Sequence, residues 1–254
     1  MTKRYALRND QWERIKDLLP GRKQTVGVTA RDNRLFVEAV LYRCRAGIPW
    51  RDLPERFGDF RLVHLRHSRW SQTGVWRHVF EALAQDADNE YVIESTRPSS
   101  KPTSTARGRK KGPEQCEAIG RSRGGLTTKI HTTVDALGNP TGFHLTPGQA
   151  HDLEGADVLL KSTPGAMVIA DKAYDAQERL IEPLQKAGKA VVIPCLKTRR
   201  HQRSHDRHLY KARHLIENFF ARLKQYRAIA TRYDKTARNF LGAIHLAAAV
   251  VWLN

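Results

Sequence analysis

The stretch YKARHLIENFFARLK, from Tyr210 to Lys224, has the most distinctive pattern in this chain. Its apolar residues recur at intervals of three and four, which predicts an amphipathic helix with one face packed into a core. On such a helix Tyr210, Arg213, Glu217 and Lys224 fall close together beside the apolar face. A single carboxylate between basic residues is either a solvated ion pair or part of a site at the edge of the core. The other acidic residues of the chain bear on that choice. The apolar positions are Ala212, Leu215, Ile216, Phe219, Phe220 and Leu223.

The composition indicates a globular, strongly basic protein. The chain has 254 residues, of which 40% are hydrophobic, and its net charge is +18. That length allows one large domain or two smaller ones with a real core. Because so much positive charge repels itself, a polyanionic partner is expected, and double-stranded DNA is the leading candidate. A membrane surface is the rival partner, but we find no basic amphipathic helix of low hydrophobicity, so no membrane partner is expected.

Cysteine use and the first residues predict a cytoplasmic protein. Cys44, Cys116 and Cys195 lie far apart and form no C-x-x-C motif, which fits a reducing compartment. The opening residues MTKRYALRND are charged and predict no signal peptide. The longest apolar run, Ala243 to Leu253, is too short to span a bilayer and predicts a buried terminal helix.

Residues 1–85 have the pattern of an all-helical domain. Within it, a helix from Trp50 to Phe57, a turn at Gly58, and a second helix from Arg61 to Trp70 predict a helix-turn-helix that binds DNA. The alternative is an ordinary helical bundle with a solvated basic face. The side chains that the second helix would present to DNA are Arg61, His64, Arg66, His67 and Arg69.

A polar linker at 85–90 separates this part from a second predicted domain, residues 91–254. Its pattern is a strand, a β-hairpin, and then strands alternating with helices, which predicts a mixed α/β sheet of the ribonuclease H-like kind. A basic loop at 97–125, with Arg121 and Arg123 as candidates for DNA contact, either folds onto DNA or is a solvated linker. The expected strands are 91–93, 127–134, 141–145, 166–170 and 190–193, and the expected helices are 152–160, 175–186, 210–224 and 236–253.

Three acidic residues occupy positions where a site is expected. Glu94 directly follows the first predicted strand, Asp171 directly follows the fourth, and Glu217 lies on the amphipathic helix. Residues just beyond strand ends line the crevice in which ligands bind to open sheets. Carboxylates that converge there can hold two Mg²⁺ ions, with Mn²⁺ able to substitute, and such a pair promotes phosphodiester chemistry.

Other candidate ligands are weaker. Asp135 lies in the hairpin turn and Asp152 at a helix start, so turn and capping roles are expected, and Asp175 is a further alternative acid. His201, His205 and His208 have a ligand-like spacing but lie among arginines, which favours phosphate contact over metal binding. A structural zinc site is not expected, because the chain has no cysteine pair.

These segments resemble bacterial insertion-sequence transposases of the DDE type, specifically the IS-five family, over nearly the whole chain. The family signature of Tyr, Arg, Glu and Lys is matched by Tyr210, Arg213, Glu217 and Lys224. Further matching segments are IGRSRGGLTTKIH from Ile119, DALGNPTGFHLTPGQAHD from Asp135, VIADKAYD from Val168 and KQYRAIATRYDKTARNF from Lys224.

The resemblance implies roles for several residues. Glu94, Asp171 and Glu217 would be the three catalytic acids and metal ligands, while Arg213 and Lys224 would contact phosphates and Tyr210 would orient the helix. Lys172 is a further candidate for DNA contact. The implied reaction is nicking at the terminal inverted repeats and attack of the freed 3′-hydroxyl on target DNA, by a dimer or larger assembly. A bacterial, nucleoid-associated location follows from the same resemblance.

One position departs from the family. The first acid there is Asp in the context Asp-Ser-Thr, whereas this chain has Glu94-Ser95-Thr96. The extra methylene moves the carboxylate by about an ångström, and a misplacement of that size can cost about a hundredfold in rate. Two functions therefore stay open: an active transposase, and a catalytically impaired copy that only binds DNA. A third function, a ribonuclease H-like nuclease acting on RNA–DNA hybrids, is supported by the expected fold alone.

Overall fold

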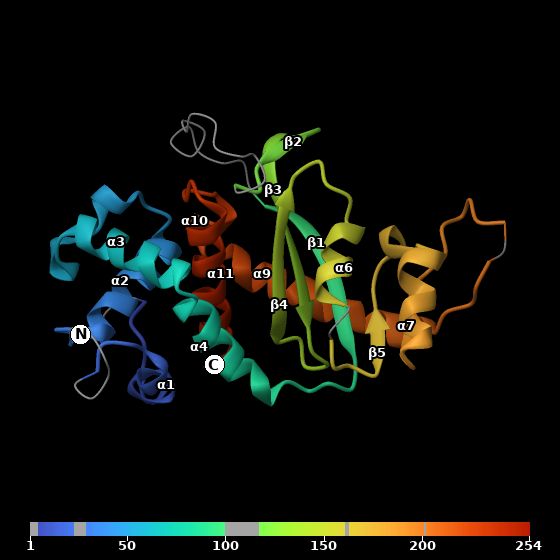
Figure 1. Cartoon of the computed structure of the whole chain (residues 1–254), viewed down its shortest axis with the longest axis horizontal. Helices are drawn as coiled ribbons and strands as arrows, with labels where there is room; N and C mark the ends of the chain where they lie inside the picture. The colour runs from blue at the N-terminus through green and yellow to red at the C-terminus, as the bar shows by residue number, and fades with distance from the viewer. Residues whose placement is uncertain (1–4, 23–28, 100–116, 161–162, 201) are drawn as a thin grey trace. The chain divides into compact units, whose positions relative to one another are not determined.

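The computed structural model describes residues 5–22, 29–99, 117–160, 163–200 and 202–254, which form two compact units (Figure 1). The helical unit contains the described residues of 1–85, Glu117 and residues 223–254. The sheet unit contains residues 86–99 and the described residues of 118–222. The compact units thus differ from the domains expected from the sequence, because residues from Leu223 onward pack with the N-terminal helices. The predicted functional domains, 1–85 and 91–254, stay a prediction.

The core of the helical unit forms around α11 (Ala237–Trp252), which packs against α4, α3 and α2. The rings of Phe36, Trp70 and Trp76 meet in this core, with centroids 4.9 to 5.9 Å apart. The terminal helix expected from the apolar run is therefore confirmed as a buried helix. The other helices of this unit are α1 (Asn9–Ile15), α2 (Asn33–Ala46), α3 (Phe60–Gln72), α4 (Val75–Leu83) and α10 (Arg227–Ala230), with short 3₁₀ turns at Lys16–Leu18, Trp50–Asp52, Glu55–Phe57 and Ala84–Asp86.

The predicted first helix of the helix-turn-helix, Trp50 to Phe57, is wrong. That segment forms two separate 3₁₀ turns, Trp50–Asp52 and Glu55–Phe57. Pro54 explains the break, since proline lacks an N–H and disfavours the α conformation in the residue before it. The second helix, α3, is present, but His67 on it is fully buried rather than presented to solvent.

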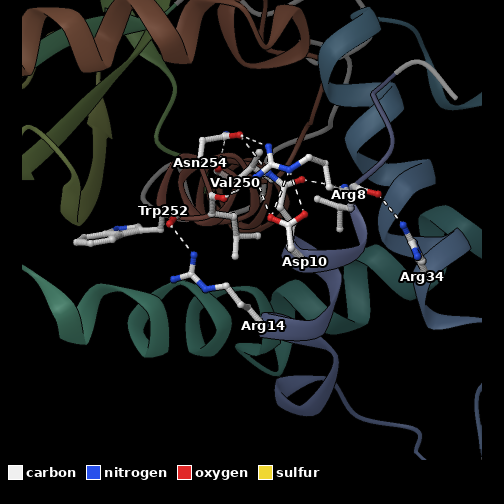
Figure 2. A network of polar contacts seen from close by, with 10 residues as sticks. Arg8, Asp10, Arg14, Arg34, Val250, Trp252 and Asn254 are labelled. Atoms are coloured by element: carbon white, nitrogen blue, oxygen red, sulfur yellow. Dashed lines mark hydrogen bonds and ion pairs between the residues drawn. The ribbon is translucent and has the colours of Figure 1, made fainter. Parts of the chain in front are cut away.

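The N-terminal segment holds the end of α11 through polar contacts (Figure 2). Gln11 Nε2 donates to the Leu253 carbonyl (3.4 Å) and Arg14 Nη1 to the Trp252 carbonyl (3.3 Å). The last carbonyls of a helix have no partner within that helix, so these donors satisfy groups that would otherwise need water. Arg8 is held in the same network by Asp10, at 3.0 Å. The first and last described helices are thereby joined within one unit.

The sheet unit is built on a mixed sheet of six strands in the order β2-β3-β1-β5-β6, with β4 paired to β3. β3 is antiparallel to β1, β2 and β4, whereas β1, β5 and β6 are parallel. Asp135 closes the β3–β4 hairpin by accepting hydrogen bonds from the backbone N–H groups of Leu137 and Asn139, which confirms its turn role. The strands are β1 (Val92–Ser99), β2 (Gly120–Ser122), β3 (Gly125–Val134), β4 (Pro140–Pro147), β5 (Met167–Ile169) and β6 (Ala190–Val192).

Helices cover both faces of this sheet. On one face, α6 (Leu153–Leu159) and α7 (Glu182–Lys186) pack in a core that includes Val92 and Val168. On the other face lies α9 (His214–Lys224), where the Phe219 ring is 5.8 Å from the Phe143 ring of β4. Figure 1 shows α6 and α9 on opposite sides of β3 and β4. Between β5 and α7 the chain forms a 3₁₀ turn (Lys172–Tyr174) and a π-helical turn (Gln177–Ile181).

Two sequence expectations need correction here. The single helix expected over 210–224 consists of α8 (Arg207–Tyr210), a 3₁₀ turn (Lys211–Arg213) and α9, although its predicted apolar face is buried. The first strand does not end before Glu94 but continues to Ser99, because residues 93–99 pair with β3. The expected basic loop at 97–125 therefore begins and ends in strands, and its residues 100–116 lie outside the described part.

Candidate active site

Arg213 lies between two of the three predicted catalytic acids. Its Nη1 is 3.1 Å from Oε1 of Glu217, one helical turn further along the chain. Its Nη2 is 4.0 Å from Oδ2 of Asp171, which comes from the end of a sheet strand. The Glu217 and Asp171 side chains are 53% and 31% exposed, so both carboxylates are open to a ligand from solvent. The structure thus brings these two acids together beside a shared cation.

The position of Asp171 is set by the backbone around it. It follows β5 after one residue, Ala170, whose N–H donates to the Val192 carbonyl of the neighbouring strand. Asp171 Oδ1 accepts the N–H of Ala173 at 2.8 Å and so caps the 3₁₀ turn that follows. Because that turn holds Oδ1, the second oxygen is the one directed to Arg213.

Glu94 is not part of this pair. It is the third residue of β1, on the same face as Val92, whose side chain lies in the core beneath α6. Glu94 is 0% exposed, and neither of its carboxylate oxygens has a hydrogen-bond partner among the residues that the structure describes. Burial, followed by the nearby charges of Asp152 and Asp171, raises the pKa of Glu94 well above its usual range. A buried carboxyl without partners is neutral in the folded protein at the pH where free glutamate ionises.

Divalent-metal chemistry fits two of the predicted ligands and not the third. Asp171 and Glu217 offer the exposed carboxylate oxygens that Mg²⁺ and Mn²⁺ prefer. In the described part of the chain, however, no group of three or more His, Cys, Asp or Glu side chains is arranged to hold a metal ion. Among the described residues, the fully buried Glu94 is not grouped with the other two acids. Its predicted role as a ligand therefore stays a prediction, which this arrangement does not favour.

The alternative acids are occupied by other partners. Asp175 has a fully buried carboxylate that pairs with Arg199 and Arg203 at 3.0 and 2.7 Å. Asp152 was expected to cap α6, but its side chain makes no capping bond and pairs instead with Lys129 at 2.7 Å. Both residues therefore have ion-pair partners within the sheet unit.

The basic candidates are divided between the two units. In the sheet unit Lys172, Arg121 and Arg123 are exposed, while Tyr210 is half-buried against the His205 ring. Lys224, at the end of α9, is exposed and falls in the helical unit. His205 and His208 belong to no metal-binding cluster of the described residues, and His201 lies outside them.

The candidates on α3 are not equivalent. Arg61 and Arg69 are exposed and available to a polyanion. Arg66 is half-buried, because its guanidinium lies over the rings of Phe36 and Trp70 at 4.3 and 4.7 Å. Burial lowers the pKa of Arg66, although an arginine remains charged. Its predicted DNA contact therefore competes with packing inside the helical unit.

A buried hydrogen-bonded chain next to the site was not anticipated from the sequence. Thr96 Oγ1 lies 2.6 Å from the Tyr174 hydroxyl and 2.7 Å from His131 Nδ1. The second ring nitrogen of His131 lies 2.7 Å from Thr146 Oγ1. The only sequence signal was the occurrence of Thr96 and Tyr174 inside the two acidic motifs, EST and DKAYD.

Comparisons with known proteins agree with this architecture. A family model described as "Transposase DDE domain" matches residues 96–252, and one described as "Putative transposase of IS4/5 family" matches residues 7–80. Since the first match covers more than half of the chain, the protein belongs to the transposase DDE domain family. The match begins two residues after Glu94, so that acid lies outside the matched residues.

Individual relatives are insertion-sequence proteins. The chain is 43% identical over 132 residues to "Putative transposase for insertion sequence element IS6501" of Brucella ovis, a match that covers 50% of this chain and 99% of the relative. It is 32% identical over 133 residues to the transposase for insertion sequence element IS1106 of Neisseria meningitidis serogroup B, covering 48% of this chain and 42% of that protein. These matches and the family models identify the chain as a transposase of an insertion sequence.

Similarity to solved structures is remote. A cryo-EM structure of the piggyBac transposase synaptic complex with hairpin DNA aligns with a TM-score of 0.41 and 14% identity. The alignment covers 75% of this chain and 48% of that one. A similarity at this level carries no argument about the site.

None of the helices in the described residues combines the length and apolar character needed to cross a membrane.

Proposed function

We propose that this transposase binds the terminal inverted repeats of its insertion sequence, nicks the ends and joins the freed 3′-hydroxyls to target DNA. The observation that carries the proposal is the pair of exposed carboxylates, Asp171 and Glu217, placed on either side of Arg213 in a chain of the DDE family. The mixed sheet that positions Asp171 is proposed to be ribonuclease H-like. The net charge of +18 supports a polyanionic partner.

In this proposal the two exposed acids hold a divalent cation, Mg²⁺ or Mn²⁺. When bound, such an ion stabilises the charge that develops on a phosphodiester as it is attacked. The acids provide the oxygen ligands, and the Arg213 guanidinium, set free from them, contacts a phosphate oxygen near the scissile bond. Lys172 and Lys224 neutralise further phosphates, and Tyr210 orients the start of the helical run.

The same proposal assigns partners and location. Exposed Arg61 and Arg69 of α3, Arg121 of β2 and Arg123 of the β2–β3 turn supply contacts to DNA outside the reacting centre. Cutting and joining two ends requires both to be held at once, which favours a homodimer or larger assembly on DNA. A cytoplasmic protein associated with the nucleoid is the location that fits this partner.

One observation favours the second candidate function, a protein that binds DNA without cutting it. The buried, unpartnered carboxyl of Glu94 leaves the acidic pair without its expected third member. A chain that keeps its basic surfaces but lacks a complete site would occupy the ends of the element and restrain active copies. Its binding would depend on salt but not on divalent metal.

The test is nicking of DNA that carries the ends of the element, in the presence of Mg²⁺ or Mn²⁺. We expect Glu217→Gln to lower the nicking rate by about 100-fold or more, because a neutral amide no longer stabilises the developing charge. Glu178→Gln, which changes an exposed acid outside the site, is the matched control and should leave the rate unchanged. DNA binding by both variants should equal that of the unmodified protein in fluorescence anisotropy.

Glu94→Asp separates the two functions in the same assay. If the shorter side chain lets the first acid reach the site, the nicking rate will rise above that of the unmodified protein. Metal-dependent nicking by the unmodified chain, lost in Glu217→Gln, supports an enzyme that tolerates Glu94. Salt-dependent DNA binding without nicking by either protein would replace the enzyme with the DNA-binding function.

A further inference from the structure

We propose that Thr96 is a positioning residue for Asp171, acting through Tyr174. This inference rests on the proposed function, because it assigns to Asp171 a place in the reacting centre. The Thr96 hydroxyl lies 2.6 Å from the Tyr174 hydroxyl, and Tyr174 is the last residue of the 3₁₀ turn that Asp171 caps. The hydrogen bond therefore ties the middle of β1 to the turn that holds the second acid.

The attachment is short, and it is buried on the Tyr174 side and partly buried at Thr96. Only two residues separate Asp171 from Tyr174, and two hydrogen bonds hold that segment. The Ala173 N–H donates to Oδ1 of the Asp171 side chain, and the Tyr174 N–H donates to the Asp171 backbone carbonyl. The Tyr174 ring is fixed in the core beneath α6, with 1% of its surface exposed. A shift of the Tyr174 hydroxyl would be transmitted to Asp171, because the intervening turn has little freedom to absorb it.

His131 gives the Thr96 hydroxyl a defined direction. Burial lowers the pKa of His131 to about 4, so its ring is neutral near pH 7 and has one donor and one acceptor nitrogen. One arrangement uses every proton between the rings: Tyr174 O–H donates to Thr96, Thr96 O–H donates to His131 Nδ1, and His131 Nε2–H donates to Thr146. The reverse direction would leave the buried Tyr174 proton without an acceptor among the described residues.

Packing around His131 leaves this arrangement little alternative. A Cβ added to Gly155 of α6 would fall 2.0 Å from His131 Nδ1, so the backbone of α6 lies directly against the ring. The ring also faces the side chain of His144 on β4, at 6.0 Å between centroids. The imidazole is fixed in place, and Thr96 is hydrogen-bonded to both His131 and Tyr174. Thr96 therefore connects the fixed His131 ring to the turn that holds Asp171.

The experiment compares Thr96→Val, which keeps the shape and removes the hydroxyl, with Thr96→Ser, which keeps the hydroxyl. We expect Thr96→Val to lower kcat for nicking on the order of 10- to 100-fold, the scale of an ångström misplacement, with the Kd for DNA unchanged. Thr96→Ser should restore most of the rate. Thr141→Val is the matched control, since it removes a similar bond between Thr141 and Thr133 that has no connection to Asp171.

A readout independent of activity keeps this inference separate from the proposed function. Hydrogen exchange of the Ala173 amide, which is bonded to Asp171 Oδ1, reports on the turn directly. Faster exchange at Ala173 in Thr96→Val, but not in Thr96→Ser or Thr141→Val, supports the inference even if no variant nicks DNA. Unchanged exchange at Ala173 in a folded Thr96→Val protein overturns it, as does an equal acceleration at every amide of the sheet unit.

Discussion

Replacing Arg43 by methionine is expected to destabilise the helical unit by about 3–5 kcal/mol, the usual cost of leaving a buried charge without its partner. Arg43 Nη1 donates to Asp234 Oδ2 at 2.7 Å, and the two side chains are 1% and 3% exposed. These residues are 191 positions apart in the sequence. The pair therefore joins α2 to the segment that precedes α11.

The electrostatics of Asp234 explain the size of the effect. Burial alone would raise the pKa of this carboxyl, but the charge and hydrogen bond of Arg43, together with His67 and His64, outweigh burial and lower the pKa. Once Arg43 is removed, Asp234 must either stay charged in the core or take up a proton. Both alternatives cost free energy in the folded state and none in the unfolded chain.

A double-mutant cycle separates the pair from its surroundings. Arg43→Met combined with Asp234→Asn should recover much of the loss, because the buried carboxylate that loses its Arg43 partner is neutralised as well. Arg77→Met is the control, since Arg77 and Glu81 form an exposed pair at 3.7 Å that should be worth less than about 1 kcal/mol. Urea unfolding of the full chain measures the five proteins: the unmodified chain, Arg43→Met, Asp234→Asn, the double variant and Arg77→Met. Equal losses of unfolding free energy for Arg43→Met and Arg77→Met would show that the buried pair stabilises the protein no more than the exposed pair does.

Local patterns in the sequence predicted the parts of this molecule that depend on local physics. The three- and four-residue spacing over 210–224 identified the buried face of α9, and the Gly and Asn residues after Asp135 identified the hairpin turn. The same periodicity placed Glu217 and Arg213 on one edge, where they form an ion pair. Asp171 was found because a short apolar strand ends just before it.

Properties that depend on strand pairing were not predictable in this way. The alternation after Ile93 is broken by polar residues, so the sequence gives no reason to extend the strand through Thr96. Pairing with β3 supplies that reason, because residues 93–99 all have partners on the neighbouring strand. The extension places Glu94 within the strand and on the core side, which is why its position relative to Asp171 differs from the expected one.

Polar contacts between residues far apart in the chain were not predictable from the sequence either. Nothing in the spacing of Thr96, His131 and Tyr174 indicates that their side chains meet, because the three come from different elements of the sheet unit. The break at Pro54, in contrast, is a local effect. A proline at this position disfavours a continuous helix over 50–57 on sequence grounds alone. The resemblance to transposases could not have corrected these points, as a family motif names residues without fixing their burial.

Glu94→Gln is expected to stabilise the protein increasingly as the pH rises above about 4.5, the ordinary pKa of the group. Below that value Glu94 is protonated in both the folded and the unfolded chain. Above it the unfolded carboxyl loses its proton while the buried one keeps it, so the unmodified protein loses stability with increasing pH. The loss continues until the pH passes the raised pKa of the folded state. Its slope is about 1.4 kcal/mol per pH unit for one proton.

The glutamine variant cannot ionise, so its stability lacks this contribution to the pH dependence. Unfolding free energies of both proteins at pH 5, 6, 7 and 8 give the difference, in which all other titrating groups cancel. Glu154→Gln, at an exposed position of α6, should follow the unmodified protein at every pH. A constant difference between Glu94→Gln and the unmodified chain would mean that Glu94 is ionised when folded. The carboxylate would then have reached a partner, and the case for a complete three-acid site would be restored.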